Sequence, residues 1–360
     1  MAPSAFPAVW TELHRQHDPG GEVWVGVPIP GTEVVARGDL IREALLAAGF
    51  EIVPPAPHPP AALLRVHEPA LVDYLRSAHH DWVAAGYPKD PGQDRVVPYV
   101  FPLPQAVADR PFRLPAAPSA RAGVYTTDTT TLIGPGTFTA AVAAADCALT
   151  AAEMVLAGAP MVYAACRPPG HHAGRAFFGG SCYLNNAALA AQALRDGGKE
   201  RVAIVDLDAN HGNGTQDIFY DRADVLYGSV HVDPGAGWFP HFVGFADERG
   251  RGPGEGANLN RPVAPDCGDG PWLAAVEDLC AAAAGQRADA LVVSLGVDGA
   301  AGDPESPLGI SPSGFARAAA ALAGLSLPTV FVQEGGYDLE RLGGLVVGTL
   351  SAFAAAGGKR

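Results

Sequence analysis

Four short segments of this chain gather side chains that can move protons or hold a cation. In order, they are RPPGHHA (167–173), DLDANHGNG (206–214), VDGAAGDPE (297–305) and EGGYD (334–338). Each follows an apolar run of the kind that forms a buried parallel strand. Ligands of open parallel sheets bind just beyond the carboxyl ends of the strands. We therefore expect these imidazoles, carboxylates and the phenol to meet in one hydrolytic metal site.

The segment DLDANHGNG places Asp206, Asp208 and Asn210 two residues apart. Side chains at that spacing point the same way on an extended strand. Paired acids in an apolar setting repel each other and need a cation or a hydrogen-bond donor between them. The alternative is a helix N-cap followed by a glycine turn, which Asp and Asn often form. Because Asp298 ends another strand in the same manner, a metal site is the favoured interpretation.

The tandem histidines His171 and His172 follow a rigid Pro-Pro-Gly turn, which is hard to explain by packing alone. Their chemistry would be proton transfer near neutral pH. In EGGYD, paired glycines permit close approach of a substrate. Tyr337 could then donate a hydrogen bond to a developing oxyanion. The alternative for Tyr337 is an aromatic side chain packed on a turn, but the three neighbouring clusters favour a catalytic role.

Strand-like and helix-like runs alternate along the chain, which predicts an α/β fold with a parallel sheet and one domain over residues 1–360. We expect the first strand at 23–30, a helix at 38–49, further helical sequence at 62–86 and a buried Ala-rich helix ending near Gly158. Later helices are expected at 184–196, 214–221, 271–284, 312–324 and 339–355.

Residues 87–119 form a Pro-rich insertion without helical periodicity. A loop of this length in a compact domain is usually functional or disordered. Because aromatic residues recur in it, we expect an ordered loop that borders the site or a subunit contact, so a homo-oligomer is possible. The alternative is a mobile excursion.

The composition restricts the partners of the chain. With 24 basic and 38 acidic residues the net charge is −14, which argues against nucleic acid and anionic membranes. The same charge would attract a small cationic substrate. The first residues lack the charged start and long apolar stretch of a signal peptide, so we expect neither a signal peptide nor a membrane-spanning segment. The cysteines are odd in number and lack CxxC spacing, which is typical of reduced thiols in a cytoplasmic protein; they are Cys147, Cys166, Cys182, Cys267 and Cys280.

A family resemblance rests on an ordered series of motifs. RPPGHHA, GGSCYLNNAA, VDLDANHGNGTQDIF, SVHVDPGAGWFP, LGVDGAAGDP and EGGYDL resemble those of the zinc-dependent histone deacetylase and acetylpolyamine amidohydrolase family. The match runs in register over 160–350 and more loosely from about residue 20. It implies the arginase/deacetylase α/β fold, with a parallel sheet of about eight strands.

The resemblance also implies roles for single residues. Asp208 and Asp298 match two of the three zinc ligands. His172 matches the general base, and His171 its partner, with Asp206 behind it. Tyr337 matches the phenol that polarises the scissile carbonyl. The inner monovalent-cation site, usually potassium, is matched by Asp206, Asp208, Ser229 and the backbone near Asn210.

The substrate channel carries one departure from the family pattern. Gly180 matches the glycine that lines the acyl-lysine channel, and Phe239 matches one aromatic wall. Ser181 stands where the family usually has another aromatic, so the channel should be wider or more polar. Glu305 matches the position of an acidic gatekeeper in the animal polyamine deacetylase, where it could receive a distal ammonium. The alternative for Glu305 is a solvated loop acid.

A second departure concerns the metal. Asn210 stands where the family has its third zinc ligand, a histidine, and an amide oxygen is a much poorer ligand for zinc. A site of Asp208, Asn210 and Asp298 would bind zinc more weakly or prefer a harder cation. His211 is adjacent but should point away. The sequence leaves open a natural variant with altered metal preference, a degenerate enzyme, or an introduced substitution.

These patterns favour a metal-dependent amidohydrolase that removes an acetyl or similar acyl group from an amine, most simply an acetylpolyamine or other small acylamine. A protein deacetylase acting on acetyl-lysine is the nearest alternative. The alternative of another class is a catalytically impaired deacetylase-fold binding protein, and Asn210 is its only support.

Overall fold

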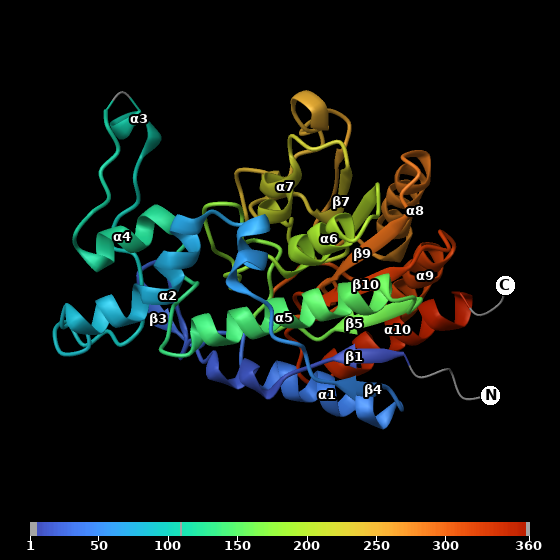
Figure 1. Ribbon diagram of the computed structural model, residues 1–360, viewed down its shortest axis with the longest axis horizontal. Coiled ribbons are helices and arrows are strands. Elements are labelled where there is room, and N and C mark those ends of the chain that lie inside the picture. Colours follow the sequence, from blue (N-terminus) through green and yellow to red (C-terminus); the bar gives the residue numbers. More distant parts are fainter. Residues whose placement is uncertain (1–5, 109, 358–360) are drawn as a thin grey trace.

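An eight-stranded parallel sheet forms the centre of the computed structural model, which describes residues 6–108 and 110–357 (Figure 1). The strand order is β4-β1-β5-β10-β9-β6-β7-β8, and all neighbours in this sheet pair in parallel. The strands are β1 (Pro7–Val9), β4 (Glu51–Val53), β5 (Met161–Ala164), β6 (Val202–Asp206), β7 (Val225–Val232), β8 (Asn258–Val263), β9 (Ala290–Leu295) and β10 (Thr329–Gln333). The predicted fold class and strand number are therefore confirmed.

Helices cover both faces of the sheet, because alternate residues of the buried strands point to opposite sides. One apolar layer joins the sheet to α2 (Pro69–Ala84), α5 (Thr137–Leu156) and α6 (Asn186–Asp196). The other joins it to α1 (Ala36–Ala47), α8 (Asp269–Gly285), α9 (Pro312–Ala323) and α10 (Leu342–Gly357). The short helix α7 (Asn213–Phe219) follows β6 directly. The helices expected from the sequence are therefore present, with shifted ends.

The expectation of a first strand at 23–30 is wrong. The first strand of the sheet is β1, and the apolar run instead forms an antiparallel hairpin of β2 (Glu22–Trp24) and β3 (Val27–Ile29). Val25 and Gly26 both adopt positive φ, which folds the run back on itself. The side chains of Trp24 and Val25 are 58% and 82% exposed, so the run borders the site rather than the core.

One helix, α5, is long and apolar enough by length and composition to cross a membrane, although Asp146 and Glu153 interrupt its apolar sequence. Most of this helix is buried inside the fold, where it packs against α6 and β5. A single helix of this kind is weak evidence for a membrane span, because core helices pass the same test. Gly158 follows the helix with a φ of +107°, as expected for a residue just past a helix end.

The Pro-rich insertion projects from the body as an arm, which we define as residues 97–117 (Figure 1). It carries the short helix α3 (Pro104–Val107) and returns to the body at α4 (Pro118–Tyr125). Tyr99, Leu103 and Phe112 are exposed on it. At its base, Phe101 lines a cavity beside the site, so the insertion does border that region.

A buried ionic network fastens the N-terminal part of the chain to the edge of the sheet. The Glu33 carboxylate accepts from Arg37 Nη1 and Arg167 Nη2, both at 2.9 Å. Arg37 also donates to the carbonyls of Glu334 and Gly336, both at 2.7 Å. The positive charges beside Glu33 outweigh its burial and hold its pKa below the usual range. The EGGYD segment is thereby tied to the helix that begins at residue 36.

Candidate active site

The segments RPPGHHA, DLDANHGNG, VDGAAGDPE and EGGYD each follow one of four neighbouring strands, at one edge of the sheet. β5, β6, β9 and β10 are adjacent or nearly so, and each runs into one of the segments. Because the strands are parallel, their carboxyl ends lie together. The side chains that the sequence spreads from residue 167 to residue 338 are thereby brought to a single place.

Two buried carboxylates face a common space at this edge. Asp208 accepts from the Gly335 N–H at 2.8 Å and the Asn210 N–H at 2.9 Å, and Asp298 accepts from the Ala209 N–H at 2.9 Å. Asp298 Oδ2 is buried and has no hydrogen-bond partner among the described residues. Burial and the nearby charge of Asp208 raise the pKa of Asp298 well above its usual value. Such a pair needs a positive group between its members.

Gly335 shows how closely these oxygens approach. A Cβ added there would lie 2.4 Å from Asp298 Oδ2 and 2.6 Å from Asp208 Oδ2. Both oxygens therefore border one small volume that a side chain at 335 would fill. The unpartnered oxygen and this cradle fit a divalent cation, and carboxylate and amide oxygens are ligands that divalent cations accept.

Asn210 lies beside these acids and lines the cavity above them. Its amide donates from Nδ2 to the Phe239 carbonyl at 3.3 Å, which directs the amide nitrogen toward the channel wall. His211 is buried elsewhere, with Nε2 at 3.2 Å from Asn260 Oδ1 and its ring against His231. Asn210, and not His211, therefore lines the cavity beside the two acids.

The tandem histidines lie in different electrostatic settings. His171 donates from Nδ1 to Asp206 Oδ2 at 3.0 Å, and its Nε2 lies 3.7 Å from Asp208 Oδ1. Burial alone would lower the pKa of His171, but the charges of Asp208 and Asp206 outweigh it and raise the pKa to about 10. This histidine therefore carries a positive charge that offsets part of the buried acid.

His172 stays neutral, because burial and the charge of His171 lower its pKa well below the usual value. It donates from Nδ1 to Asn213 Oδ1 at 2.7 Å, which fixes the tautomer with Nε2 free to accept a proton. Its ring packs edge-on against the Phe239 ring, with 4.8 Å between the two ring centroids. Sequence reasoning did not identify Asn213. The only available signal was its place two residues after His211, in the turn that opens α7.

Above these groups is a cavity of about 520 Å³. It is lined by His172, Asn210 and Tyr337 and by all four predicted channel residues, Gly180, Ser181, Phe239 and Glu305. Gly180 and Ser181 both have positive φ, and a Cβ at Gly180 would lie 2.3 Å from His172 Cδ2. Only glycine fits that approach. Asp128 holds this turn by accepting from the Gly180 N–H at 2.7 Å.

Two acids stand among the residues that line this cavity. Glu305 is exposed and accepts from Thr32 Oγ1 at 2.7 Å, and Glu22 lines the same cavity from the β2–β3 hairpin. Burial and the charge of Glu305 raise the pKa of Glu22 to about 7. Glu22 was not identified from the sequence, because the run around it resembled a core strand and gave no sign of facing a cavity.

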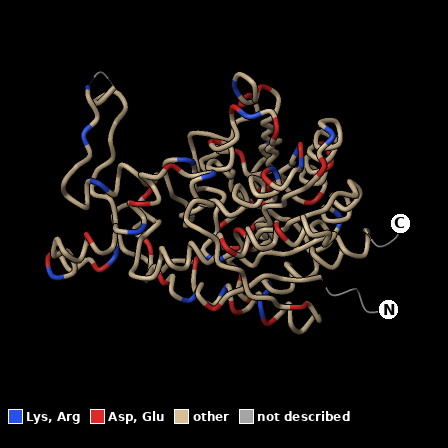
Figure 2. Tube along the Cα trace, viewed as in Figure 1, with Lys and Arg blue, Asp and Glu red and all other residues tan. Residues whose placement is uncertain are grey.

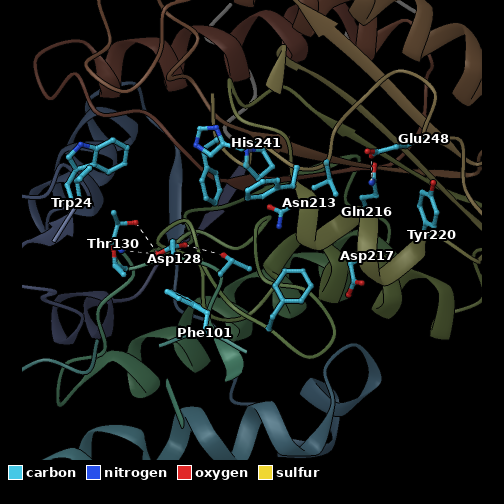
Figure 3. A pocket seen from close by; sticks show the side chains of 18 of the residues that line it. Trp24, Phe101, Asp128, Thr130, Asn213, Gln216, Asp217, Tyr220, His241 and Glu248 are labelled. Atoms are coloured by element: carbon cyan, nitrogen blue, oxygen red, sulfur yellow. Dashed lines mark hydrogen bonds between the residues drawn. The ribbon is translucent and has the colours of Figure 1, made fainter. Parts of the chain in front are cut away.

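A second cavity of about 820 Å³ adjoins the first and shares Trp24, Thr130, Phe239 and His241 with it (Figure 3). Its lining mixes aromatic side chains, including the exposed Phe242, with polar and charged ones. Figure 3 shows Asp128 bonded to Thr130 on one side, and Gln216 bonded to Glu248 on the other.

Of the predicted monovalent-cation residues, Asp206 ends β6 and Ser229 lies on the neighbouring strand β7, while Asp208 follows β6. Asp206 and Ser229 are register partners, and both are fully buried. His231 donates from Nε2 to the Gly244 carbonyl at 2.8 Å, so its Nδ1 accepts from Ser229 Oγ at 2.8 Å.

Tyr337 completes the set. Its phenol lines the cavity, and the Arg37 guanidinium lies 4.5 Å from its ring centre. Burial raises the pKa of Tyr337 well above its usual value, so the hydroxyl keeps its proton. Arg37 was not identified from the sequence, since a single arginine in an amphipathic helix is normally a surface residue. Asp303 accepts from the Tyr337 N–H at 2.8 Å.

The site combines a neutral imidazole, a protonated phenol and paired acids at the carboxyl edge of a parallel sheet. This combination is typical of sites for metal-assisted hydrolysis. Comparison with known proteins agrees. The family model described as "Histone deacetylase domain" matches residues 32–353, and this chain belongs to that family.

The chain is similar over nearly its whole length to bacterial members of the family. It is 42% identical over 350 residues to acetylpolyamine amidohydrolase 1 of Pseudomonas aeruginosa, covering 97% of this chain and 99% of that protein. It is 37% identical to acetylpolyamine amidohydrolase of Mycoplana ramosa, covering 96% and 99%. The crystal structure of acetylpolyamine aminohydrolase from Burkholderia pseudomallei superimposes with a TM-score of 0.91 at 36% identity, covering 98% and 99%.

Histone deacetylases are also similar, but over less of the chain or at lower identity. Histone deacetylase 8 of Arabidopsis thaliana is 36% identical over 218 residues, covering 58% of each chain. The crystal structure of the HDA15 HD domain superimposes with a TM-score of 0.79 at 26% identity, covering 98% of this chain and 90% of that one.

The cradle at Gly335 yields a test. If Asp208 and Asp298 ligate a divalent cation, Gly335→Ala should lower metal content and affinity at least about tenfold, because the new methyl displaces the two carboxylate oxygens. Metal content after dialysis, measured by mass spectrometry, checks this. Gly344→Ala is the control, since a Cβ there has nothing within 4 Å. Equal metal content in the two variants would contradict the assignment.

Proposed function

We propose that this chain is a metal-dependent amidohydrolase that removes an acetyl or similar acyl group from a small cationic amine, in particular an acetylpolyamine. The observation that carries the proposal is one cavity lined by His172 and Tyr337 together with two carboxylates, Glu22 and Glu305. The full-length similarity to proteins called acetylpolyamine amidohydrolases supports the same substrate class.

Asp208, Asn210 and Asp298 would hold one divalent cation, zinc or a harder ion. Such an ion, when bound, supplies Lewis acidity to a carbonyl and lowers the pKa of water. The unpartnered Asp298 oxygen and the cradle beside Gly335 support binding there. We also propose a structural potassium ion held by Asp206, Asp208 and Ser229, supported by the buried, register-paired positions of Asp206 and Ser229.

The protein side chains would divide the proton chemistry. His172, neutral and with Nε2 free, would accept a proton from the attacking water. His171, held positive by Asp206, would help to balance the charge that the acids bring to the site. Tyr337, which keeps its proton, would donate a hydrogen bond to the carbonyl oxygen as negative charge develops there. The leaving amine would receive its proton from a histidine.

Small acylamines are favoured over acetyl-lysine in proteins for two reasons. Glu22 and Glu305 place two acids where a second ammonium of a polyamine would lie, and an acetyl-lysine side chain has no such group. The similarity to histone deacetylase 8 spans only part of both chains, while the similarity to the amidohydrolases spans nearly all of them. Asn210 remains the one feature that favours a binding protein without turnover.

Three further proposals concern the partners and the compartment of the chain. The exposed apolar side chains of the arm support a contact with a second copy of the chain. The five cysteines are all free and buried, which supports a reducing compartment such as the cytoplasm. Figure 2 shows Lys and Arg dispersed along the trace rather than gathered on one element, which supports the absence of a nucleic-acid partner.

The first test of the function is the chemical step. His172→Ala and Tyr337→Phe should each lower kcat and kcat/KM for acetylputrescine together by about a hundredfold or more, because a general base and an oxyanion donor act mainly in the transition state. Acetate release measures the rates, and thermal melts should be nearly unchanged. Turnover near that of the parent in either variant would remove that residue from the mechanism.

The second test concerns the metal. Asn210→His should bind zinc more tightly and hydrolyse acetylputrescine faster, because imidazole is a better zinc ligand than an amide oxygen. Zinc titration by calorimetry on metal-free protein gives the affinity. His211→Asn is the matched control, because it makes the reverse exchange of imidazole and amide one residue away, and it should leave zinc affinity nearly unchanged. Unaltered affinity in Asn210→His would show that residue 210 is not a ligand.

The third test concerns charge recognition. Acetylputrescine should outcompete the neutral N-butylacetamide in kcat/KM, and Glu305→Gln should shrink that preference without slowing the neutral substrate. Rising salt should weaken it, because Glu305 is exposed. Since Glu22 has a pKa of about 7, it gains its charge as the pH rises through that value, so the preference should grow between pH ~6 and ~8. Equal kcat/KM for both amides in the parent would leave only a general deacylase.

A further inference from the structure

Asp303 is a buried acid that does not line the cavity yet contacts two of its residues through their backbones. Its side chain is 5% exposed and belongs to the loop after β9, five residues beyond Asp298. Oδ2 accepts from the Tyr337 N–H at 2.8 Å and the Asp338 N–H at 3.1 Å. Oδ1 accepts from the Glu305 N–H at 3.0 Å. The Asp303 carboxylate therefore hydrogen-bonds to the backbones of both Tyr337 and Glu305.

The Tyr337 loop and the Glu305 side chain are each held by a further hydrogen bond that does not involve Asp303. The loop of Tyr337 is held through the carbonyl of Gly336, which accepts from Arg37 at 2.7 Å. The side chain of Glu305 is held by the hydroxyl of Thr32 at 2.7 Å. Asp303 is the only described side chain that bonds to both the Tyr337 and the Glu305 backbones. Loss of its bonds would free the two groups to move relative to each other.

We infer that Asp303 is a positioning residue that sets the separation between the Tyr337 phenol and the Glu305 carboxylate. Under the proposed function, on which this inference rests, the phenol meets the acyl carbonyl and the carboxylate meets the distal ammonium. Their separation then selects the length of the carbon chain between the two nitrogens of the substrate. Asp303 thus determines which acetylated diamine fits best, although it touches no part of it.

The two oxygens of Asp303 make a graded test available. Asn at this position keeps one acceptor oxygen and gains an amide that cannot accept. We expect that oxygen to retain the two N–H donors of Tyr337 and Asp338, and the amide to face the Glu305 N–H, which repels it. Asp303→Asn should therefore release Glu305 while leaving Tyr337 in place. Asp303→Ala should release both.

The experiment measures kcat/KM for N-acetyl-1,3-diaminopropane, acetylputrescine and acetylcadaverine, with N-butylacetamide as the neutral reference. The parent should prefer one chain length. Asp303→Asn should reduce the ratio of kcat/KM between the best and the worst chain length by about tenfold, the order expected for the loss of one well-placed hydrogen bond. The kcat/KM for the neutral amide should stay within about threefold of the parent, because Tyr337 keeps its hydrogen bond. Asp303→Ala should flatten the preference and also lower kcat on every substrate.

Two variants separate this role from general damage to the fold. Thr32→Val removes only the side-chain anchor of Glu305, so it should weaken the charged-over-neutral preference with kcat on the neutral amide unchanged. Tyr337→Phe should lower kcat and keep the length profile. If Asp303→Ala does not fold, Asp303→Asn decides the question alone.

The outcomes for the inference and for the proposed function are distinct. A parent that shows neither charge nor length preference overturns the proposed substrate class. A parent with a clear length preference that Asp303→Asn retains in full overturns the positioning role and leaves the substrate class standing.

Discussion

The structure depends on the need to keep several negative charges buried at one edge of the sheet. Asp206, Asp208, Asp298 and Glu334 are all at most 1% exposed. Within residues 6–108 and 110–357, their side chains form ion pairs only with His171. Backbone N–H groups and one charged imidazole offset part of this charge, and an unpartnered oxygen remains on Asp298. Isolated buried carboxylates are too costly to persist without compensation, so the unpartnered oxygen and raised pKa of Asp298 mark where a cation would be stabilised under the proposed function.

That requirement explains features that would otherwise seem unrelated. Gly335 has no side chain because two carboxylate oxygens occupy the place of its Cβ. Arg37 crosses from the N-terminal helix to hold the EGGYD carbonyls, and Glu33 keeps that arginine charged in the interior. The acids around His171 raise its pKa, so this imidazole is protonated. Burial and the positive charge of His171 lower the pKa of His172, which therefore stays neutral. A general base and its charged neighbour therefore come from adjacent positions in the sequence.

Much of the fold and of the acid–histidine centre was predictable because it depends on short-range patterns. Apolar runs separated by helical periodicity specify a parallel sheet, and motifs that follow the strands are brought to one edge by topology alone. The residues that were missed act at long range. Arg37 and Glu334 are 297 residues apart, and Glu22 belongs to a hairpin whose apolar sequence resembled a core strand. The hairpin forms because two residues with positive φ reverse the chain, a conformation that the pattern of apolar residues does not reveal.

The sequence by itself determined the chemical inventory: which strands carry acids, which turn carries the tandem histidines, and that an asparagine replaces the expected third ligand. The first two are local facts that follow from residue type and spacing along a strand, and the third follows from the resemblance of the motifs to those of the family. Only the tertiary structure decided that Glu22 lines the cavity, that Asn213 bonds to His172, and that Asp303 joins Tyr337 to Glu305. Those contacts depend on how loops from different strands pack against one another, and their geometry is set by burial and hydrogen bonding across the whole sheet edge.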